Sequence, residues 1–278
     1  MHSIGWFSTA KGPGSRNLLT AALRSIEKGE IRSKINYVFI SREPGESSET
    51  DKFIDLANSY GIPVVCYSYK RYRQENCNSM GRQNDFHEWR MGYDREVMRL
   101  LSSFPKPDIN ILAGYMLIVG PEMCRRYNMI NLHPAAPDGP VGTWQDVIWQ
   151  LIGTGTGSSG VMMHLVTPEL DKGPVVSYCR FAIKHTNRFD LYWREIEGYR
   201  VEDIKATQGE QNRLFQEIRR HGATRELPLI VSTINAFSKG IISIRDGQTY
   251  DANGLLISGY DLSEHIDRLV KAELDATS

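Results

Sequence analysis

The sequence has few of the residues that build disulfide frameworks and zinc sites. Its four cysteines, Cys66, Cys77, Cys124 and Cys179, form no Cys-x-x-Cys pair and do not cluster with histidines. This spacing argues against a zinc centre or a disulfide scaffold and fits a reducing compartment. The first ten residues, MHSIGWFSTA, also lack the basic-then-apolar layout of a signal peptide. We therefore expect a cytoplasmic protein without a bound metal.

Long apolar runs and an excess of one charge are missing as well. The longest apolar run, INILAGYMLIVG, has about 12 residues, whereas a membrane-spanning helix needs about 20. The 33 basic residues balance 33 acidic ones, so no global field attracts nucleic acid or an anionic membrane. The basic run YKRYRQ (69–74) carries interleaved aromatics, and we interpret it as a solvated loop. We expect a soluble protein that binds neither nucleic acid nor membrane.

Short apolar segments alternate with amphipathic ones over most of the 278 residues. Strands are predicted at 3–9, 35–41, 62–69, 108–114, 129–133 and 161–167, and helices at 15–29, 48–60, 85–104 and 143–152. Such alternation is typical of parallel strands joined by right-handed crossovers. The fold class predicted is α/β, an open, mostly parallel twisted sheet with helices on both faces.

The last third of the sequence has a different pattern. Residues 186–220 are charged and predicted to be helical, with an exposed insertion around 199–212. An Asp-Gly turn framed by GIISIRDGQTY and LLIS indicates a hairpin. A final amphipathic helix is expected from Ser263, its N-cap. No repeat or linker separates two autonomous domains.

The stretch INLHPAAPDGPVGTWQ (130–145) is the first candidate site. Asn131 and His133 alternate at a strand end, so their side chains project to the same side, and the Pro- and Gly-rich run after them ends the strand. In open α/β sheets, ligands lie beyond the carboxyl ends of strands. Taken alone, the pair also suits a capped strand end with a hydrogen-bonded histidine.

Two further stretches are candidates. TAKGPGSRNLL (9–19) is a glycine-bearing loop before the first helix, where backbone amides suit an anion, although an ordinary turn is an equal alternative. It lacks the third glycine of a dinucleotide fingerprint and the Lys-Ser/Thr pair of a P-loop. VTPELDKGPVV (166–176) places Asp171 in a turn with Gly173, where an aspartate usually caps its own backbone.

Together, the glycine loop, LAGYM (112–116), NLHP (131–134), Gly160 with His164, and ELDKGPV (169–175) resemble the folate-dependent formyltransferase family over most of residues 1–183. The pairing of NLHP with LDKGP some 38 residues later is the specific part. The resemblance implies transfer of a formyl group from 10-formyltetrahydrofolate, the co-substrate, to a primary amine, with no metal. Glycinamide ribotide is the default acceptor, and the acceptor is a small molecule that carries a phosphate in that case.

The resemblance also assigns roles to residues. Asn131 and His133 would donate hydrogen bonds to a developing oxyanion. Asp171 would orient His133 and a proton-relaying water, and a neighbouring carboxylate raises the pKa of a histidine. The implied folate pocket comprises Tyr115, Met116, Leu117, Ile118, Val119, Glu169 and Leu170. The implied phosphate cradle comprises Gly12, Gly14, Ser15, Arg16 and Asn17.

The implied division of the chain has three parts. Residues 1–230 form the formyltransferase domain, with an acceptor- and phosphate-binding half (1–128) and a catalytic, folate-binding half (129–230); the hairpin and helix of 231–278 pack on the same domain. The sequence departs from the family where Arg16 separates Ser15 from Asn17. The family has an arginine shortly before the asparagine, where this chain has Tyr127, Asn128 and Met129. The family's amine-binding glutamate aligns with Ala223, with Glu226 nearby.

These departures leave alternatives open. A sugar or another small amine is a second acceptor class, and a formyltetrahydrofolate hydrolase would use the same triad with water, although that enzyme usually has an N-terminal regulatory domain. A tRNA acceptor is disfavoured because only about 48 residues follow position 230. A nicotinamide-dependent oxidoreductase would need an acidic residue such as Glu43 after the second strand, and a non-catalytic folate-binding protein would have a damaged triad. The sequence leaves open whether the protein forms a homodimer.

Overall fold

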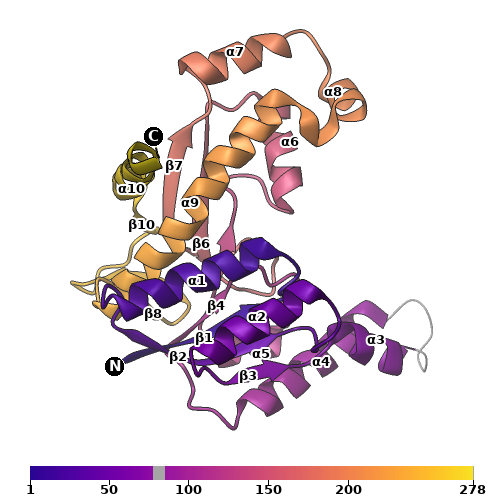
Figure 1. Ribbon diagram of the computed structural model, residues 1–278, viewed down its shortest axis with the longest axis vertical. Helices are drawn as coiled ribbons and strands as arrows, with labels where there is room; N and C mark the ends of the chain where they lie inside the picture. Colours follow the sequence, from indigo (N-terminus) through magenta and orange to yellow (C-terminus); the bar gives the residue numbers. More distant parts are fainter. Residues whose placement is uncertain (78–84, 278) are drawn as a thin grey trace.

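The computed structural model describes residues 1–77 and 85–277. Its centre is an eight-stranded sheet of order β10-β7-β6-β5-β4-β1-β2-β3 (Figure 1). The strands of this sheet are β1 (His2–Ser8), β2 (Ser33–Ile40), β3 (Val64–Cys66), β4 (Ile109–Leu112), β5 (Met129–His133), β6 (Ser158–Leu165), β7 (Val175–Ala182) and β10 (Tyr260–Asp261). Five of the seven neighbouring pairs are parallel, and β6 runs antiparallel to both β5 and β7. The open, mostly parallel sheet predicted from the sequence is confirmed.

Helices cover both faces of this sheet because successive side chains of a strand point in opposite directions. The α-helices are α1 (Pro13–Glu27), α2 (Ser48–Ser59), α3 (Tyr69–Cys77), α4 (Asp85–Leu101), α5 (Pro121–Arg126), α6 (Trp144–Thr154), α7 (Asn187–Glu195), α8 (Val201–Thr207), α9 (Arg213–Ser238) and α10 (Ser263–Thr277). Trp6 and Val38 face a core shared with α1, α2, α6 and α9. Phe7 and Phe39, one residue further along each strand, face a second core built with α4 and α5.

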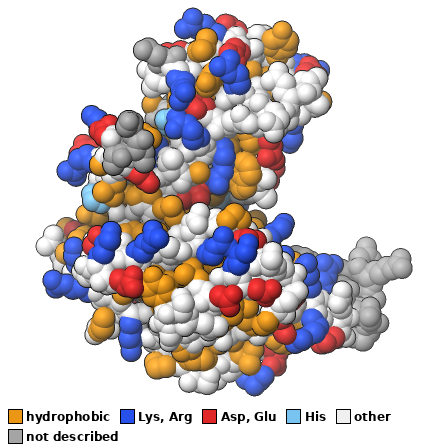
Figure 2. Space-filling model, in the orientation of Figure 1, with side chains coloured by type: hydrophobic (Ala, Val, Ile, Leu, Met, Phe, Trp, Pro, Cys, Tyr) orange, Lys and Arg blue, Asp and Glu red, His pale blue; other side chains and the backbone are white. Residues whose placement is uncertain are grey.

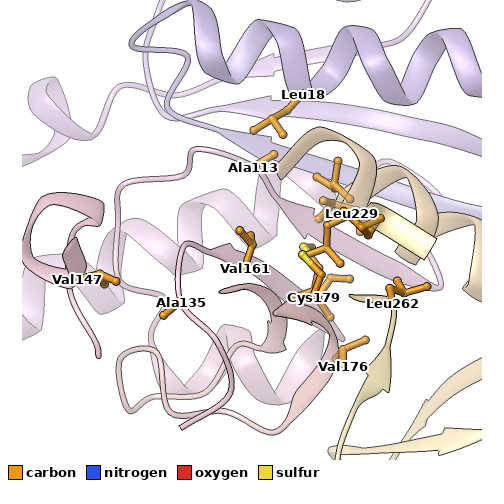
Figure 3. Close-up of a cluster of buried hydrophobic side chains, with 14 of the residues drawn as sticks. Leu18, Ala113, Ala135, Val147, Val161, Val176, Cys179, Leu229 and Leu262 are labelled. Atoms are coloured by element: carbon orange, nitrogen blue, oxygen red, sulfur yellow. The ribbon is translucent and has the colours of Figure 1, made fainter. Parts of the chain in front are cut away.

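One core joins the two halves of the chain. Leu18 on α1, Ala113 after β4, Val161 on β6 and Leu229 on α9 belong to the same buried cluster (Figure 3). Helix α9 lies across β6 and β7 and reaches α1 (Figure 1). This packing fixes the end of β5, in the second half, relative to the loop after β1, in the first half.

The C-terminal segment contains the predicted hairpin and helix. β8 (Ile242–Arg245) and β9 (Gln248–Asp251) pair in antiparallel fashion around Asp246 and Gly247, which both have positive φ. This is the Asp-Gly turn whose twist matches a two-residue hairpin. Helix α10 packs on α9 and β7. The strand β10, which was not predicted, adds a parallel edge beside β7.

Four details differ from the sequence prediction. Residues 69–74 lie in helix α3 and not in a loop, so the strand predicted over 62–69 ends at Cys66. The insertion expected around 199–212 contains α8 and a short 3₁₀ helix at Gly209–Gln211. The segment 255–258 makes only an isolated bridge, between Leu256 and Tyr250. The boundary expected at residue 230 falls inside α9, which continues through Pro228 without a break.

The surface carries mixed charge. On the face shown in Figure 2, Lys and Arg side chains are interspersed with Asp and Glu, in keeping with the formal net charge of zero. None of the described helices combines the length and the apolar character that a membrane-spanning helix needs.

Candidate active site

Strand register brings Asn131 and His164 together. β5 and β6 are antiparallel, and Asn131 pairs directly with His164, so the two side chains lie on the same face. The His164 Nδ1 donates to the carbonyl oxygen of Leu165 at 2.9 Å, which leaves Nε2 as an acceptor in the neutral ring. The amide Nδ2 of Asn131 donates to that Nε2 at 3.2 Å. The side chain of Asn131 is thereby oriented by a neighbouring strand.

His133 is held by the loop that follows it. The side chain is buried, and its Nε2 donates to the carbonyl oxygen of Pro140 at 3.0 Å. The loop then ends in a capping box, where Thr143 and Asp146 exchange hydrogen bonds at the start of α6. Gly142, with a φ of 113°, makes the turn into this box. The capped start of α6 thus positions the loop whose Pro140 carbonyl oxygen accepts a hydrogen bond from His133.

Asp171 comes from the connection between β6 and β7 and faces both histidines. Its Oδ2 lies 3.6 Å from Nδ1 of His133, and its Oδ1 lies 3.5 Å from Nε2 of His164. The backbone N–H of Gly142 donates to Oδ2 at 3.4 Å. The φ of Asp171 is 53°, in the left-handed region that non-glycine residues seldom adopt. Strained backbone of this kind persists where the surrounding structure imposes it, often at functional sites.

Gly173 allows the Asp171 turn to approach β6 closely. A Cβ at position 173 would lie 1.7 Å from the carbonyl oxygen of Leu165. A side chain there would therefore push the turn away from the strand that carries His164. The glycine in LDKGP is a packing requirement of the site.

The protonation states follow from burial and neighbours. Burial lowers the pKa of His133 below its ordinary value, although the Pro140 carbonyl and the Asp171 carboxylate act in the opposite direction. The Asp171 carboxylate does act to raise the pKa of His133, as expected, but desolvation of the buried ring outweighs the nearby charge, so the net shift is downward. For Asp171, burial raises the pKa, but the two imidazoles and the Gly142 amide together lower it below the usual range. Near neutral pH the site holds a carboxylate beside a neutral His133.

The comparisons with known proteins bear on this geometry. A model of the family described as "Formyl transferase" matches residues 17–196. The chain belongs to the formyl transferase family. Phosphoribosylglycinamide formyltransferase of Escherichia coli (strain K12) is 34% identical over 96 residues, which cover 34% of this chain and 44% of that protein. Phosphoribosylglycinamide formyltransferase of Dictyostelium discoideum is 23% identical over 172 residues, which cover 59% of this chain and 77% of that protein. The aligned segment thus spans less than half of the Escherichia coli relative.

Solved structures share the fold. Phosphoribosylglycinamide formyltransferase from Coxiella burnetii superposes with a TM-score of 0.64 at 17% identity, covering 94% of this chain and 98% of that one. A formyltetrahydrofolate deformylase from Pseudomonas syringae pv. tomato str. DC3000 gives a TM-score of 0.59 at 18% identity, with 90% and 65% covered. At such identities the likeness concerns the fold.

His164 is the site residue that the sequence reading left unassigned. It appeared only as part of the motif that carries the family resemblance. Its position inside the segment 161–167 gave one usable signal, since a polar ring in an otherwise apolar strand needs a polar partner. The partners, Asn131 and Asp171, become visible only through the β5–β6 register.

The segment expected to line a folate pocket divides between core and surface. Tyr115 and Val119 are buried in the core beside Phe7 and α4. Met116 is 69% exposed and Ile118 is also exposed, while Leu117 is half-buried. This alternation leaves apolar side chains open to solvent after β4.

Two other expected lining residues lie in the Asp171 turn. Leu170 and Glu169 are both exposed. Leu170 directly precedes Asp171, and Val141, which is exposed as well, lies between the two loop residues that bond His133 and Asp171. Exposed apolar residues therefore adjoin in sequence both Asp171 and the loop residues that bond the site.

The glycine loop forms the N-terminus of α1. Gly12 is the N-cap in an extended conformation, with no side-chain cap, and Pro13 follows at the first helical position. Gly14 has open space around its Cβ position and no positive φ, so the protein fold itself does not require a glycine there. Ser15 packs closely against Gly114, and Asn17 is exposed. The loop thus borders the segment that follows β4.

Arg16 does not lie free in this loop. Its Nη1 pairs with Oε2 of Glu49, in the first turn of α2, at 2.5 Å. On the other side of the site, Arg219 of α9 pairs with Glu226 at 2.5 Å and stacks over the ring of Trp144, the first residue of α6. Tyr127 is buried in the second core. Glu226, the glutamate nearest to the expected amine-binding position, is therefore already paired with Arg219, which contacts the start of α6.

A cavity beside α6 lies apart from Asn131, His133 and Asp171. This cavity of about 660 Å³ lies between α6, α7 and α8, and neither Asn131, His133 nor Asp171 lines it. Among the described residues, no group of three or more His, Cys, Asp or Glu side chains could hold a metal ion. The candidate active site is therefore identified by its polar geometry.

Proposed function

We propose that the protein transfers a formyl group from 10-formyltetrahydrofolate to a primary amine, with glycinamide ribotide as the default acceptor. One observation carries the proposal. Asp171, which follows Asn131 by 40 positions in the sequence, lies with Asn131 and His133 at the carboxyl end of β5. An amide donor, an imidazole and a carboxylate are the groups that acyl transfer to an amine requires.

The residues around Asp171 suit a flat, largely apolar donor. Met116, Ile118, Val141 and Leu170 are all exposed apolar side chains. Met116 and Ile118 follow β4, whose Leu112 pairs with Asn131. Leu170 precedes Asp171 in the sequence, and Val141 precedes Gly142, whose N–H bonds Asp171. Small-molecule sites commonly combine such apolar walls with a few convergent polar groups. The donor, when bound, supplies a formyl carbon activated for attack.

The amide of Asn131 stabilises charge on the formyl oxygen. When the amine attacks, that oxygen becomes negative, and the Asn131 amide can donate its second N–H to it while His164 holds the first. The Asn131 amide is already oriented by His164, so this hydrogen-bond donor needs little reorganisation during the reaction. Loss of one such donor costs about 2.7–4 kcal/mol of barrier.

His133 can accept the proton that the attacking amine must lose, and Asp171 stabilises the protonated ring. His133 is neutral and has its free nitrogen, Nδ1, directed at the Asp171 carboxylate. A proton taken from the amine can be held at Nδ1, where that carboxylate stabilises it. It then passes to the folate nitrogen as the bond between this nitrogen and the formyl carbon breaks. The 3.4–3.6 Å distances around Asp171 exceed ordinary hydrogen-bond lengths, which is common in free enzymes before the substrate tightens the site.

A screen of amines tests the proposal. The protein is incubated with 10-formyltetrahydrofolate and glycinamide ribotide, or with amino sugars and other small amines, and release of tetrahydrofolate is followed. We expect release to depend on an amine and to be lost in His133→Ala. Release at the same rate without any amine would instead make the protein a hydrolase. Absence of release with every amine, in a protein shown to bind reduced folate, would refute formyl transfer.

A further inference from the structure

Arg42 lies at the carboxyl end of β2, beside the loop that follows β1. The preceding residue, Ser41, donates its backbone N–H to the carbonyl oxygen of Ser8 and its hydroxyl to Thr9 Oγ1, both at 3.1 Å. The Arg42 side chain is 7% exposed. A guanidinium is thus buried at the same edge of the sheet as the candidate active site, on the far side of β1.

The buried charge of Arg42 has no counter-ion in the described part of the chain. Arg90 and Arg225 are buried to a similar degree, and each has a carboxylate partner: Asp94 at 3.9 Å and Asp267 at 2.7 Å. Arg42 has none within ion-pair distance, its Nε has no hydrogen-bond partner, and its Nη1 makes a long 3.4 Å bond to Ser47 Oγ. Because a buried charge without a partner is strongly unfavourable, an anion bound beside Arg42 would stabilise its guanidinium.

Two helix N-termini converge on the same place. Ser47, the Arg42 contact, is the N-cap of the 12-residue helix α2. The hydroxyl of Thr50, in the first turn of α2, donates to the carbonyl oxygen of Ala10 in the loop that leads into α1. α1 and α2 lie side by side on one face of the sheet (Figure 1). The backbone N–H groups at such helix starts favour negative charge.

We propose that Arg42 is the counter-ion for an anionic group of the acceptor substrate, held between the starts of α1 and α2. This rests on the proposed formyl transfer. The strand order places β2 three positions from β5, which corresponds to roughly 14 Å between the strand ends at a spacing of about 4.8 Å. The acceptor therefore carries its amine and its phosphate or carboxylate at opposite ends of an elongated molecule, as a phosphorylated amino sugar does.

Thermal shift with simple anions tests the site without any turnover. Inorganic phosphate and acetate are added at matched ionic strength to the wild type, Arg42→Met and the control Arg225→Met, with chloride as the reference. We expect phosphate or acetate to raise the Tm of the wild type and of Arg225→Met, because ligands stabilise the state that binds them, and to leave Arg42→Met unchanged. The more effective anion distinguishes phosphate from carboxylate. Equal shifts in wild type and Arg42→Met, or no shift in the wild type, would overturn the proposal.

Stability without anion gives a second readout. We expect Arg42→Met to have a higher Tm than the wild type, because an unpaired buried charge is removed. Arg225→Met should have a lower Tm, because the bonds of Arg225 to Asp267 and to the His221 carbonyl oxygen and its contact with the Phe181 ring are lost. A lower Tm for Arg42→Met would show that the guanidinium supports the fold. Failure of both Arg42→Met and Arg42→Lys to fold would also make Arg42 structural and overturn the proposal.

Kinetics separate this inference from the proposed function. With an active acceptor, Arg42→Met should raise its KM about tenfold or more, as expected for a lost charge-assisted hydrogen bond, and leave the KM of the folate donor unchanged. Anion binding through Arg42 without any formyl transfer would refute the proposed function and keep the anion site. Formyl transfer with an unchanged acceptor KM in Arg42→Met would refute the anion site alone.

Discussion

The carboxylate of Asp171 lies 3.6 Å from Nδ1 of His133, and this contact opposes the effect of burial on the histidine. Burial favours the neutral ring and Asp171 favours the imidazolium, with the net result that the pKa of His133 is lowered. Near neutral pH, His133 is therefore free to accept a proton, and a charge is already in place to stabilise the proton once it arrives. This balance makes the pair testable by substitution and by pH.

Replacing Asp171 separates its charge from its backbone role. Asp171→Asn and Asp171→Ala should each lower kcat by about two orders of magnitude, because both remove the carboxylate that faces His133. Alanine should in addition cost about 1 kcal/mol of unfolding free energy relative to asparagine, since asparagine tolerates the positive φ of this position better. Steady-state kinetics and urea unfolding measure the two effects. Equal stability of the two variants would contradict the role given to the strained backbone.

The pH dependence of kcat/KM should have an acid limb with a midpoint below 6.5, the ordinary pKa of histidine. His133 must be neutral to accept a proton, and burial holds its pKa below that value, so activity falls only when the pH drops through the lowered pKa. In Asp171→Asn the limb should move to still lower pH, because the contact that raises the pKa of His133 is gone. A limb that moves to higher pH in this variant would exclude His133 as the titrating group.

Asn131→Ala and His133→Ala should each reduce kcat by about two orders of magnitude or more and leave folate affinity near normal. Both side chains act on charge that develops during the reaction, so the ground-state complex loses little. The double variant of His133 and Asp171 should resemble the more impaired single variant, since Asp171 acts through His133. Additive losses in kcat would show that the two residues act independently. Near-normal transfer by folded His133→Ala would refute the mechanism.

Two glycines provide a matched comparison. Gly173→Ala should lower both stability and kcat, because its Cβ would lie 1.7 Å from the Leu165 carbonyl oxygen and displace the Asp171 turn. Gly14→Ala has open space around the new Cβ and should leave unfolding free energy unchanged or slightly higher, as alanine favours helix. Circular dichroism melts and kcat of the two variants check this. A stable, active Gly173→Ala protein would mean that the turn can shift without consequence for the site.

Several features of the fold could be read from the sequence because they depend on short-range patterns. Alternating apolar runs and amphipathic segments predicted the parallel sheet. The Asp246–Gly247 pair predicted the hairpin, since this pair favours the type I′ turn, which has positive φ at both central positions. The run at 69–74 was misread because its charges hide a helix that starts at Tyr69. The edge strand β10 has two residues, too few to leave a periodic signal.

The site shows the same division between local and tertiary information. The sequence by itself placed Asn131 and His133 on one side of a strand end, because side-chain alternation is a local property. The turn around Asp171 predicted only a backbone-capping aspartate, and the resemblance of LDKGP to the family assigned Asp171 to the site. Only the tertiary structure decided that His164 joins them, that burial lowers the pKa of His133, and that Tyr115 faces the core. Strand register, burial and the lack of a partner for Arg42 Nε depend on residues far apart in the chain, so they are determined only when the sheet has formed.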